Sequence, residues 1–472
     1  MALRRKPLVA VVHSASSKST SAGEDLAIYL GVCLQLGGYS DVRIVGFDSA
    51  KQTPRSSNKA HGDADDVGGV PPEQRQQRKQ SGRFLVVPYA SDKPKYPNHA
   101  ECFRDTWESL SKCNVILICV DPADTSACAL ALSSAVERGS DKAIISFDLG
   151  IKNHMAVEEH LGNHNLVFLG GAIGISVARS PVDGHLRCLG GGSLVLERLT
   201  KQQSKRGVKF VNLLRSGGIP VLHCKNVRSY THGVVIFNTV HAAAALAGGP
   251  LRDLVRDRHA RLLWAAMIRE GLQALTLAAR GGDWRAANPC CGVTLPQLEL
   301  LLCLPTFLCS LVSRLLLRFP PMLAPAMQAD LADGRDTSVA WTLEEIVRIA
   351  DKHKGSAPAC RAVLSAVKKC VSEGDGVPST RPRDLPFVSE LLSGGSDSSR
   401  ALYRKVRVVV SRLFCEFLVG HSLLVPADSC RRGRRCLCRI DRCFIPVFRD
   451  LCPLLHFHSP LVCSPGYTHF VP

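Results

Sequence analysis

Two histidines flank an asparagine in the middle of the chain, and all three side chains could act on a small molecule. They are His232, Asn238 and His241. An imidazole can serve as a proton donor near neutral pH, and an amide can bind a substrate hydroxyl. Structural roles compete with these. We expect His232 in a turn and His241 in a helical run of small residues, so catalysis by the histidines is the less favoured interpretation. For Asn238, a buried helix cap and binding of a substrate hydroxyl are equally open.

A second polar stretch, HSASSKSTSAGED at residues 13–25, lies between a predicted strand and a predicted helix over 23–36. In a dinucleotide-binding fold such a turn is glycine-rich, and it binds phosphate at the positive end of the helix. Here Gly23 is the single glycine, and Glu24 and Asp25 compete with a phosphate for the helix dipole. Nucleotide binding and a turn without a nucleotide are both open.

The elements around this turn predict an α/β fold with a Rossmann-like parallel sheet. We place this domain at residues 6–200, and we interpret the polar stretch 52–82 inside it as a disordered insertion. A helix is expected over 98–112. The expected strands are 7–13, 41–47, 83–90, which resumes the sheet, 114–125 and 142–153, followed by paired strands over 165–199.

Helical patterns dominate the second half, so we predict an all-helical domain over 201–376. One long amphipathic helix should begin at Pro250 and end at Arg280. The apolar stretch 295–319 contains Glu299, Pro305 and two arginines, which favours a pair of buried helices over a membrane span.

A later helix should begin at Thr342, with Glu345 completing a capping box. The Arg- and Cys-rich tail over 377–472 should be poorly ordered.

Charge and cysteine content limit the partners and the cellular location that we expect for this chain. The formal charge is +18, but much of the excess lies in the tail, so we expect no nucleic-acid partner. The chain begins MALRRKPLVAVV, which is not typical of a secretory leader. We therefore interpret most of the 20 cysteines as reduced thiols of a cytoplasmic protein, with no metal site and no membrane segment.

Several stretches carry a resemblance to a known family. They are the Gly-Ile-Pro-Val sequence at 218–221, Asn238 before a run of small residues, and Gly334, Arg335 and Thr337 in a Gly-Arg-x-Thr string. Together they resemble the ketopantoate reductases. The resemblance implies a 6-phosphogluconate dehydrogenase-like arrangement, with a helical domain after the sheet domain. It also implies NADPH-dependent reduction of a small 2-keto acid, 2-dehydropantoate to pantoate in the pantothenate pathway, and it leaves a homodimer open.

The same resemblance assigns the site residues by position. Asn238 matches the family's motif asparagine, while Val234 stands where the family has a lysine and Ser338 where it has a glutamate. The implied cofactor-binding positions are Ser14, Ser16, Gly23, Asp121 and Leu149.

Asp121 stands where the resemblance implies a lysine that faces the cofactor phosphate. The three substitutions would remove a proton donor, its orienting carboxylate and this cation. Each such loss costs on the order of 10²–10⁴ in rate. The sequence therefore predicts a divergent oxidoreductase. The alternative is a catalytically silent relative that binds a nucleotide or a protein partner.

Overall fold

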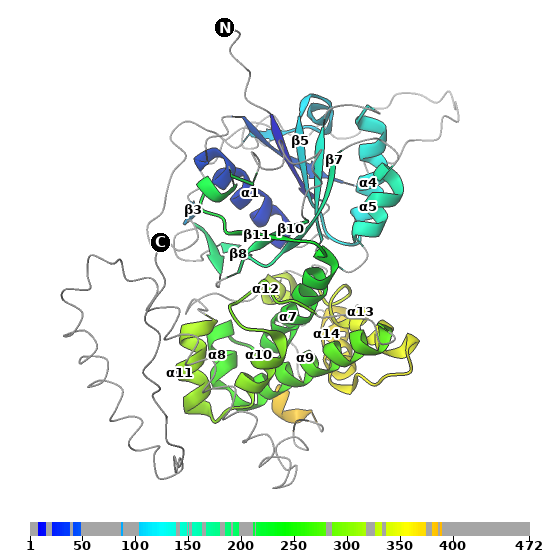
Figure 1. Cartoon of the computed structure of the whole chain (residues 1–472). Coiled ribbons are helices and arrows are strands. Elements are labelled where there is room, and N and C mark those ends of the chain that lie inside the picture. Colours follow the sequence, from blue (N-terminus) through cyan, green and yellow to red (C-terminus); the bar gives the residue numbers. More distant parts are fainter. Residues whose placement is uncertain are drawn as a thin grey trace, which may run out of the picture. The chain divides into compact units, whose positions relative to one another are not determined.

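The structure is a computed structural model, and it describes most of the chain between residues 8 and 388 (Figure 1). The described residues are 8–15, 21–37, 41–48, 86–87, 103–137, 142–148, 150, 153–162, 167–179, 185–189, 192–197, 211–212, 214–279, 286–317, 326–332, 337–373, 380–385 and 388. The chain divides into two compact units, 1–402 and 403–472. The predicted insertion at 52–82 lies outside the described residues, as does nearly all of the predicted tail. The domain boundaries near 200 and 376 stay predictions.

An eight-stranded sheet forms the N-terminal part, in the order β11-β10-β7-β6-β5-β1-β2-β4. Every neighbouring pair is parallel except β7 with β10. The strands are β1 (Val9–Ser14), β2 (Val42–Phe47), β4 (Phe103–Asp105), β5 (Val115–Cys119), β6 (Ala143–Asp148), β7 (Val167–Ile173), β10 (Leu194–Glu197) and β11 (Val221–Cys224). This confirms the predicted Rossmann-like α/β fold.

Helices cover both faces of this sheet, as Figure 1 shows. Alternate residues of the buried strand β1 enter two cores: Val9 and Val11 face α1 (Ser21–Leu36), whereas Ala10 and Val12 face the opposite side. That side holds α4 (Thr125–Ala135), α5 (Asn153–Leu161) and the 3₁₀ helix η1 (Trp107–Lys112). A strand buried on both faces needs apolar residues throughout, which explains the continuous run in its sequence.

Two predictions for the sheet were wrong. The expected helix at 98–112 contains β4, whose backbone pairs with β2, followed by η1. The strand expected at 83–90 is the short β3 (Val86–Val87), which joins a separate three-stranded sheet with β9 (Leu186–Leu189) and β8 (Ser176–Arg179). In both cases the pairing partner is distant in sequence, so local periodicity could not identify it.

The second half is helical, as predicted. Its helices are α7 (Val227–Ala247), α8 (Leu251–Arg256), α9 (Arg258–Ala278), α10 (Leu295–Leu302), α11 (Thr306–Leu316), α12 (Ala326–Ala332), α13 (Leu343–Lys352) and α14 (Pro358–Glu373), with the 3₁₀ turn η3 (Pro382–Asp384). At the centre, α7 packs on α9 through an edge-on contact of Phe237 and Trp264, with ring centroids 5.5 Å apart. The break at Pro305 between α10 and α11 is confirmed, and none of the described helices is long and apolar enough to cross a membrane.

The helix predicted to run from Pro250 to Arg280 is in fact two helices. Asp257 adopts an extended conformation between α8 and α9, and its carboxylate accepts hydrogen bonds from the backbone N–H groups of His259 and Ala260. An aspartate N-cap stabilises a new helix start, so the chain turns here although its apolar pattern continues.

The predicted capping box at Thr342 is also wrong. The Thr342 hydroxyl donates to the carbonyl of Ser338 at 2.8 Å and does not cap α13. Glu345 forms an ion pair with Arg348 one turn later.

Backbone contacts join the sheet part to the helical part. The carbonyl of Pro289 accepts a hydrogen bond from the N–H of Ser193, which precedes β10, at 2.9 Å. The N–H of Ala287 donates to the carbonyl of Ser229 in α7, also at 2.9 Å. A Cβ atom on Gly233 would lie 1.7 Å from the carbonyl oxygen of Ala287, so this close approach requires glycine. The segment 286–293 therefore fixes α7 against the end of the sheet.

Candidate functional site

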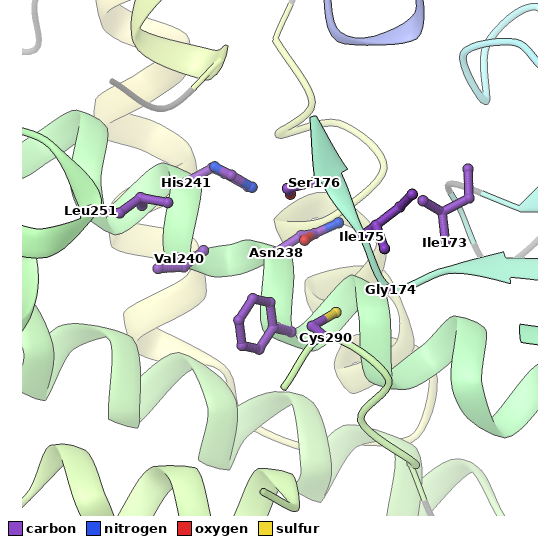
Figure 2. A pocket seen from close by; sticks show the side chains of 10 residues that line it. Ile173, Gly174, Ile175, Ser176, Asn238, Val240, His241, Leu251 and Cys290 are labelled. Carbon is purple, nitrogen blue, oxygen red and sulfur yellow. The ribbon is translucent and has the colours of Figure 1, made fainter. Parts of the chain in front are cut away.

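A pocket opens where α7 faces the turn between β7 and β8 (Figure 2). The space between its lining residues, including the part that is open to solvent, is ≈ 380 Å³. Its lining residues are Ile173, Gly174, Ile175, Ser176, Phe237, Asn238, Val240, His241, Leu251 and Cys290. They come from the sheet part, from α7, from the start of α8 and from the connecting segment, so the pocket lies between the two parts.

Helical spacing places the predicted catalytic positions on one side of α7. Residues separated by three, four or seven positions share a helix face, as do Val234, Asn238 and His241. In Figure 2 the side chains of Asn238 and His241 extend from α7 toward the strand segment that carries Ile175 and Ser176. Val234 is only 1% exposed and does not line the pocket. The structure thus brings Asn238 and His241 together at the pocket and leaves Val234 in the core.

Two predictions about these side chains were wrong. His232 is not in a turn but inside α7, where it is buried. Asn238 is not a helix cap, because it lies in the middle of α7; the helix ends at Gly248, whose φ of 72° is left-handed. The run of alanines after Asn238 continues the same helix, which ends only at Ala247.

Both histidines are held in the uncharged form by their surroundings. Burial lowers the pKa of His241 to about 4. Burial also lowers the pKa of His232 to about 4, with a further decrease from the positive charge of Arg228 and an opposing effect of Glu345. The Nδ1 atom of His241 is buried and has no hydrogen-bond partner among the described residues. A neutral imidazole offers one donor and one acceptor, so it can bind an oxygen but is a weak acid at neutral pH.

Cys290 is a pocket residue that sequence reasoning missed, as are Ser176 and Leu251. Burial raises the pKa of the Cys290 thiol well above its usual value, so the thiol stays protonated and is a poor nucleophile. Nothing in the local sequence distinguishes these residues, because only the contact between the two parts brings them to the pocket.

Ser338, the predicted counterpart of the family's glutamate, lies in a turn. Ser338 is half-buried just before α13, and its carbonyl accepts the hydroxyl of Thr342. Gly334 and Arg335 of the same string lie outside the described residues. A serine cannot supply the charge that would orient an ammonium group, so neither partner of the family's Lys–Glu pair is present at these two positions.

Three predicted cofactor positions do meet at the carboxyl edge of the sheet. Ser14 ends β1, and its hydroxyl accepts the backbone N–H of Asp121, which follows β5, at 2.9 Å. Gly23 in the first turn of α1 lies beside them: a Cβ atom there would be 3.8 Å from the carboxylate oxygen Oδ1 of Asp121. The neighbours of β1 in the sheet, β2 and β5, are reached by connections that run in opposite directions, so this is the switch point where such folds bind ligands.

Among the residues that the structure describes at this switch point, the charged side chains do not fit the phosphates of a nicotinamide dinucleotide. The buried carboxylate of Asp121 lies at the positive end of α1, where a phosphate would bind, and Glu24 adds a second carboxylate in the first turn. Like charges repel most strongly where water is excluded. Ser16 and Leu149 lie outside the described residues. No group of three or more His, Cys, Asp or Glu side chains that could hold a metal occurs in the part of the chain that the structure describes.

The architecture defines a class of protein: a Rossmann-like sheet domain followed by a helical domain, with a pocket between them. Residues 226–371 match the family model of the ketopantoate reductase PanE/ApbA C-terminal domain. The helical part of this chain is therefore similar to the C-terminal domain of the ketopantoate reductases.

Solved structures share this fold at low sequence identity. A PanE/ApbA family ketopantoate reductase from Ralstonia eutropha JMP134 is 18% identical, with a TM-score of 0.50, and the match covers 78% of this chain and 100% of that one. D-mandelate dehydrogenase in a ternary complex with NADH and anilino(oxo)acetate is 14% identical, with a TM-score of 0.53, over 77% of this chain and 99% of that one. No curated protein matches this sequence.

Proposed function

We propose that this chain descends from NADPH-dependent reductases of 2-keto acids, has lost their efficient chemistry and keeps the pocket between its two parts as a small-molecule binding site. The observation that carries this proposal is Val234. It stands where the family has its lysine, and its side chain is 1% exposed and does not line the pocket. A valine can neither donate a proton nor polarise a carbonyl group.

Two further observations support the loss of reductase activity. Ser338 replaces the carboxylate that would orient the lysine, and Asp121 places a negative charge beside the start of α1. The loss of the lysine at Val234 and of the carboxylate at Ser338 together lowers the rate by roughly 10⁴ or more, when each loss costs at least about 10². The retained features are the fold, the pocket and Asn238.

A second candidate is an active oxidoreductase that reduces 2-dehydropantoate to pantoate with NADPH. It is favoured by Asn238, which lines the pocket beside His241. A neutral imidazole there could hydrogen-bond a carbonyl oxygen, as the missing lysine would. The cytoplasmic location expected from the cysteine content and the N-terminal sequence, and the homodimer that the resemblance leaves open, are further proposals.

Turnover separates the two candidates. The purified full chain is mixed with NADPH and ketopantoate, and the absorbance of NADPH is followed beside a ketopantoate reductase of the family as a positive control. We expect a rate at least about 10⁴-fold below the control. A rate within about tenfold of the control would establish the active oxidoreductase instead.

Restoring the missing groups tests the cause. The double variant Val234→Lys with Ser338→Glu should raise turnover by at least about 10² over the wild-type chain, and by more than either single variant. Circular dichroism verifies that the variants fold, since the lysine enters a buried position. If the folded double variant gains nothing, the loss lies at the switch point, and Asp121→Asn should then tighten NADPH binding while Asp124→Asn, in the same loop, should not.

A further inference from the structure

The pocket is free of charge along its described lining. Its side chains are aliphatic or aromatic, apart from Ser176, Asn238, His241 and Cys290. None of the lining residues is Lys, Arg, Asp or Glu. The pKa of Cys290 is raised well above its usual value by burial, and that of His241 is lowered to about 4, so both side chains are uncharged near neutral pH.

Two polar groups in this apolar surrounding need a partner. The Nδ1 atom of His241 is buried without one among the described residues, and the half-buried Asn238 amide makes no hydrogen bond within that same part of the chain. A buried polar group left unsatisfied costs about 1–3 kcal/mol, so water or a ligand must satisfy the Nδ1 atom of His241. The partly exposed amide of Asn238 is accessible to the same molecule. Both side chains extend to the same side of the pocket in Figure 2. Together they offer donors and acceptors to one compact molecule.

A ligand with a carboxylate group would bind weakly in this pocket. A 2-keto acid is an anion at neutral pH, and transferring an anion out of water without a compensating cation costs several kcal/mol. The family's lysine would supply that cation, but Val234 occupies its position. An uncharged ketone, ester or alcohol loses far less hydration and can be satisfied by an amide and a neutral imidazole.

We propose that this pocket takes an uncharged small molecule with a carbonyl or hydroxyl group, hydrogen-bonded by Asn238 and His241, in preference to a carboxylate anion. This inference rests on the proposed function, in which the pocket is the ligand site. Its apolar wall, formed in part by Ile175 and Leu251, selects a molecule with a compact aliphatic body.

A pair of probes with one carbon skeleton isolates the charge. Ketopantoate is an anion, and ketopantolactone, its internal ester, is neutral. Each is titrated into the full chain by calorimetry at neutral pH, without a nucleotide. We expect the lactone to bind with a Kd at least tenfold lower than that of the acid, a difference of about 1.4 kcal/mol.

Variants connect the binding to the pocket. Asn238→Ala should weaken lactone binding by at least about fivefold, since one hydrogen bond contributes about 1 kcal/mol. The matched control is Asn226→Ala, at an exposed position before the same helix. His241→Lys places a cation in the pocket, and it should shift the preference toward the acid.

The outcomes are distinct. If the acid binds as tightly as the lactone, and Asn238→Ala weakens both, the preference for an uncharged ligand is overturned while the pocket stands as the ligand site. If neither probe binds at millimolar concentration, or if binding is the same in Asn238→Ala, both this inference and the binding role of the pocket are overturned.

Discussion

At the scale of single residues, α7 carries one position whose residue is unsuited to the family's chemistry and two positions whose side chains line the pocket. Val234, Asn238 and His241 share one helix face, yet only the last two line the pocket. Sequence comparison could place all three, because their spacing along one chain is fixed. It could not show that Ser176 and Cys290 complete the pocket, since those residues meet α7 only through the contact between the two parts.

The burial of His241 has a consequence for the pH dependence of stability. Its pKa is about 4 in the folded chain, against an ordinary value of 6.5. Below pH 6.5 the unfolded chain therefore binds more protons than the folded chain, so the free energy of unfolding falls as the pH decreases toward 4. His232, which faces Arg228 and Glu345, has a lowered pKa and acts in the same direction.

We expect His241→Gln to remove on the order of 1–2 kcal/mol of the stability lost between pH 7 and pH 4.5, after allowing for partial exposure of this side chain. Urea denaturation at the two pH values measures this difference. His223→Gln, at an exposed position of β11, is the control and should leave the difference unchanged. An unchanged pH dependence in His241→Gln would contradict the assignment of this histidine.

At the scale of elements, long-range partners decide where helices begin. The helix α14 begins at Pro358, a residue type that is favoured in the first turn of a helix. Its cap was not predictable: the carboxylate of Glu270, in α9, accepts the backbone N–H groups of Ala359 and Cys360, both at 2.8 Å. Glu270 is 8% exposed and lies some ninety residues earlier in the chain. The same kind of distant partner explains β4, which local periodicity assigned to a helix.

Removing this cap should destabilise the helical part. Glu270→Ala leaves two backbone N–H groups at the start of α14 without their charged acceptor, and we expect a loss of about 2–3 kcal/mol in the free energy of unfolding. Chemical denaturation followed by far-ultraviolet circular dichroism measures it. Glu373→Gln, at the exposed end of the same helix, should change stability by less than about 0.5 kcal/mol. Equal effects of the two variants would argue against the capping role.

At the scale of the described molecule, the segment 286–293 holds the helical part against the sheet. Gly233 permits this contact, because a Cβ atom there would meet the carbonyl oxygen of Ala287 at 1.7 Å. The Rossmann-like fold of the sheet part and the all-helical fold of the second part were both predicted correctly from the sequence, since each follows from local periodicity. The junction has no periodic sequence pattern. A glycine inside a helical pattern indicates that another segment approaches the helix closely, but it does not identify that segment.

Gly233→Ala tests this junction. Alanine favours a helix over glycine by up to about 1 kcal/mol, so an isolated α7 would gain from the change. In the folded chain we expect a net loss of at least about 2 kcal/mol, measured as a lower Tm in calorimetry. Gly292→Ala is the matched control, because a Cβ atom on Gly292 meets nothing within 4 Å. A Tm for Gly233→Ala at or above that of the wild-type chain would contradict the close approach.

The hydrogen bond from Ser193 to the carbonyl of Pro289 also limits where the coding sequence can be interrupted without harm to the sheet domain. The sheet domain depends, for one of its backbone partners, on a residue encoded almost a hundred codons downstream, beyond α7, α8 and α9. A recombination event or a premature stop just after β11, near codon 225, would release a sheet domain with an unpaired amide at Ser193 and an exposed apolar end. The two halves are therefore expected to be inherited, expressed and lost together, although each has the outline of a separate module.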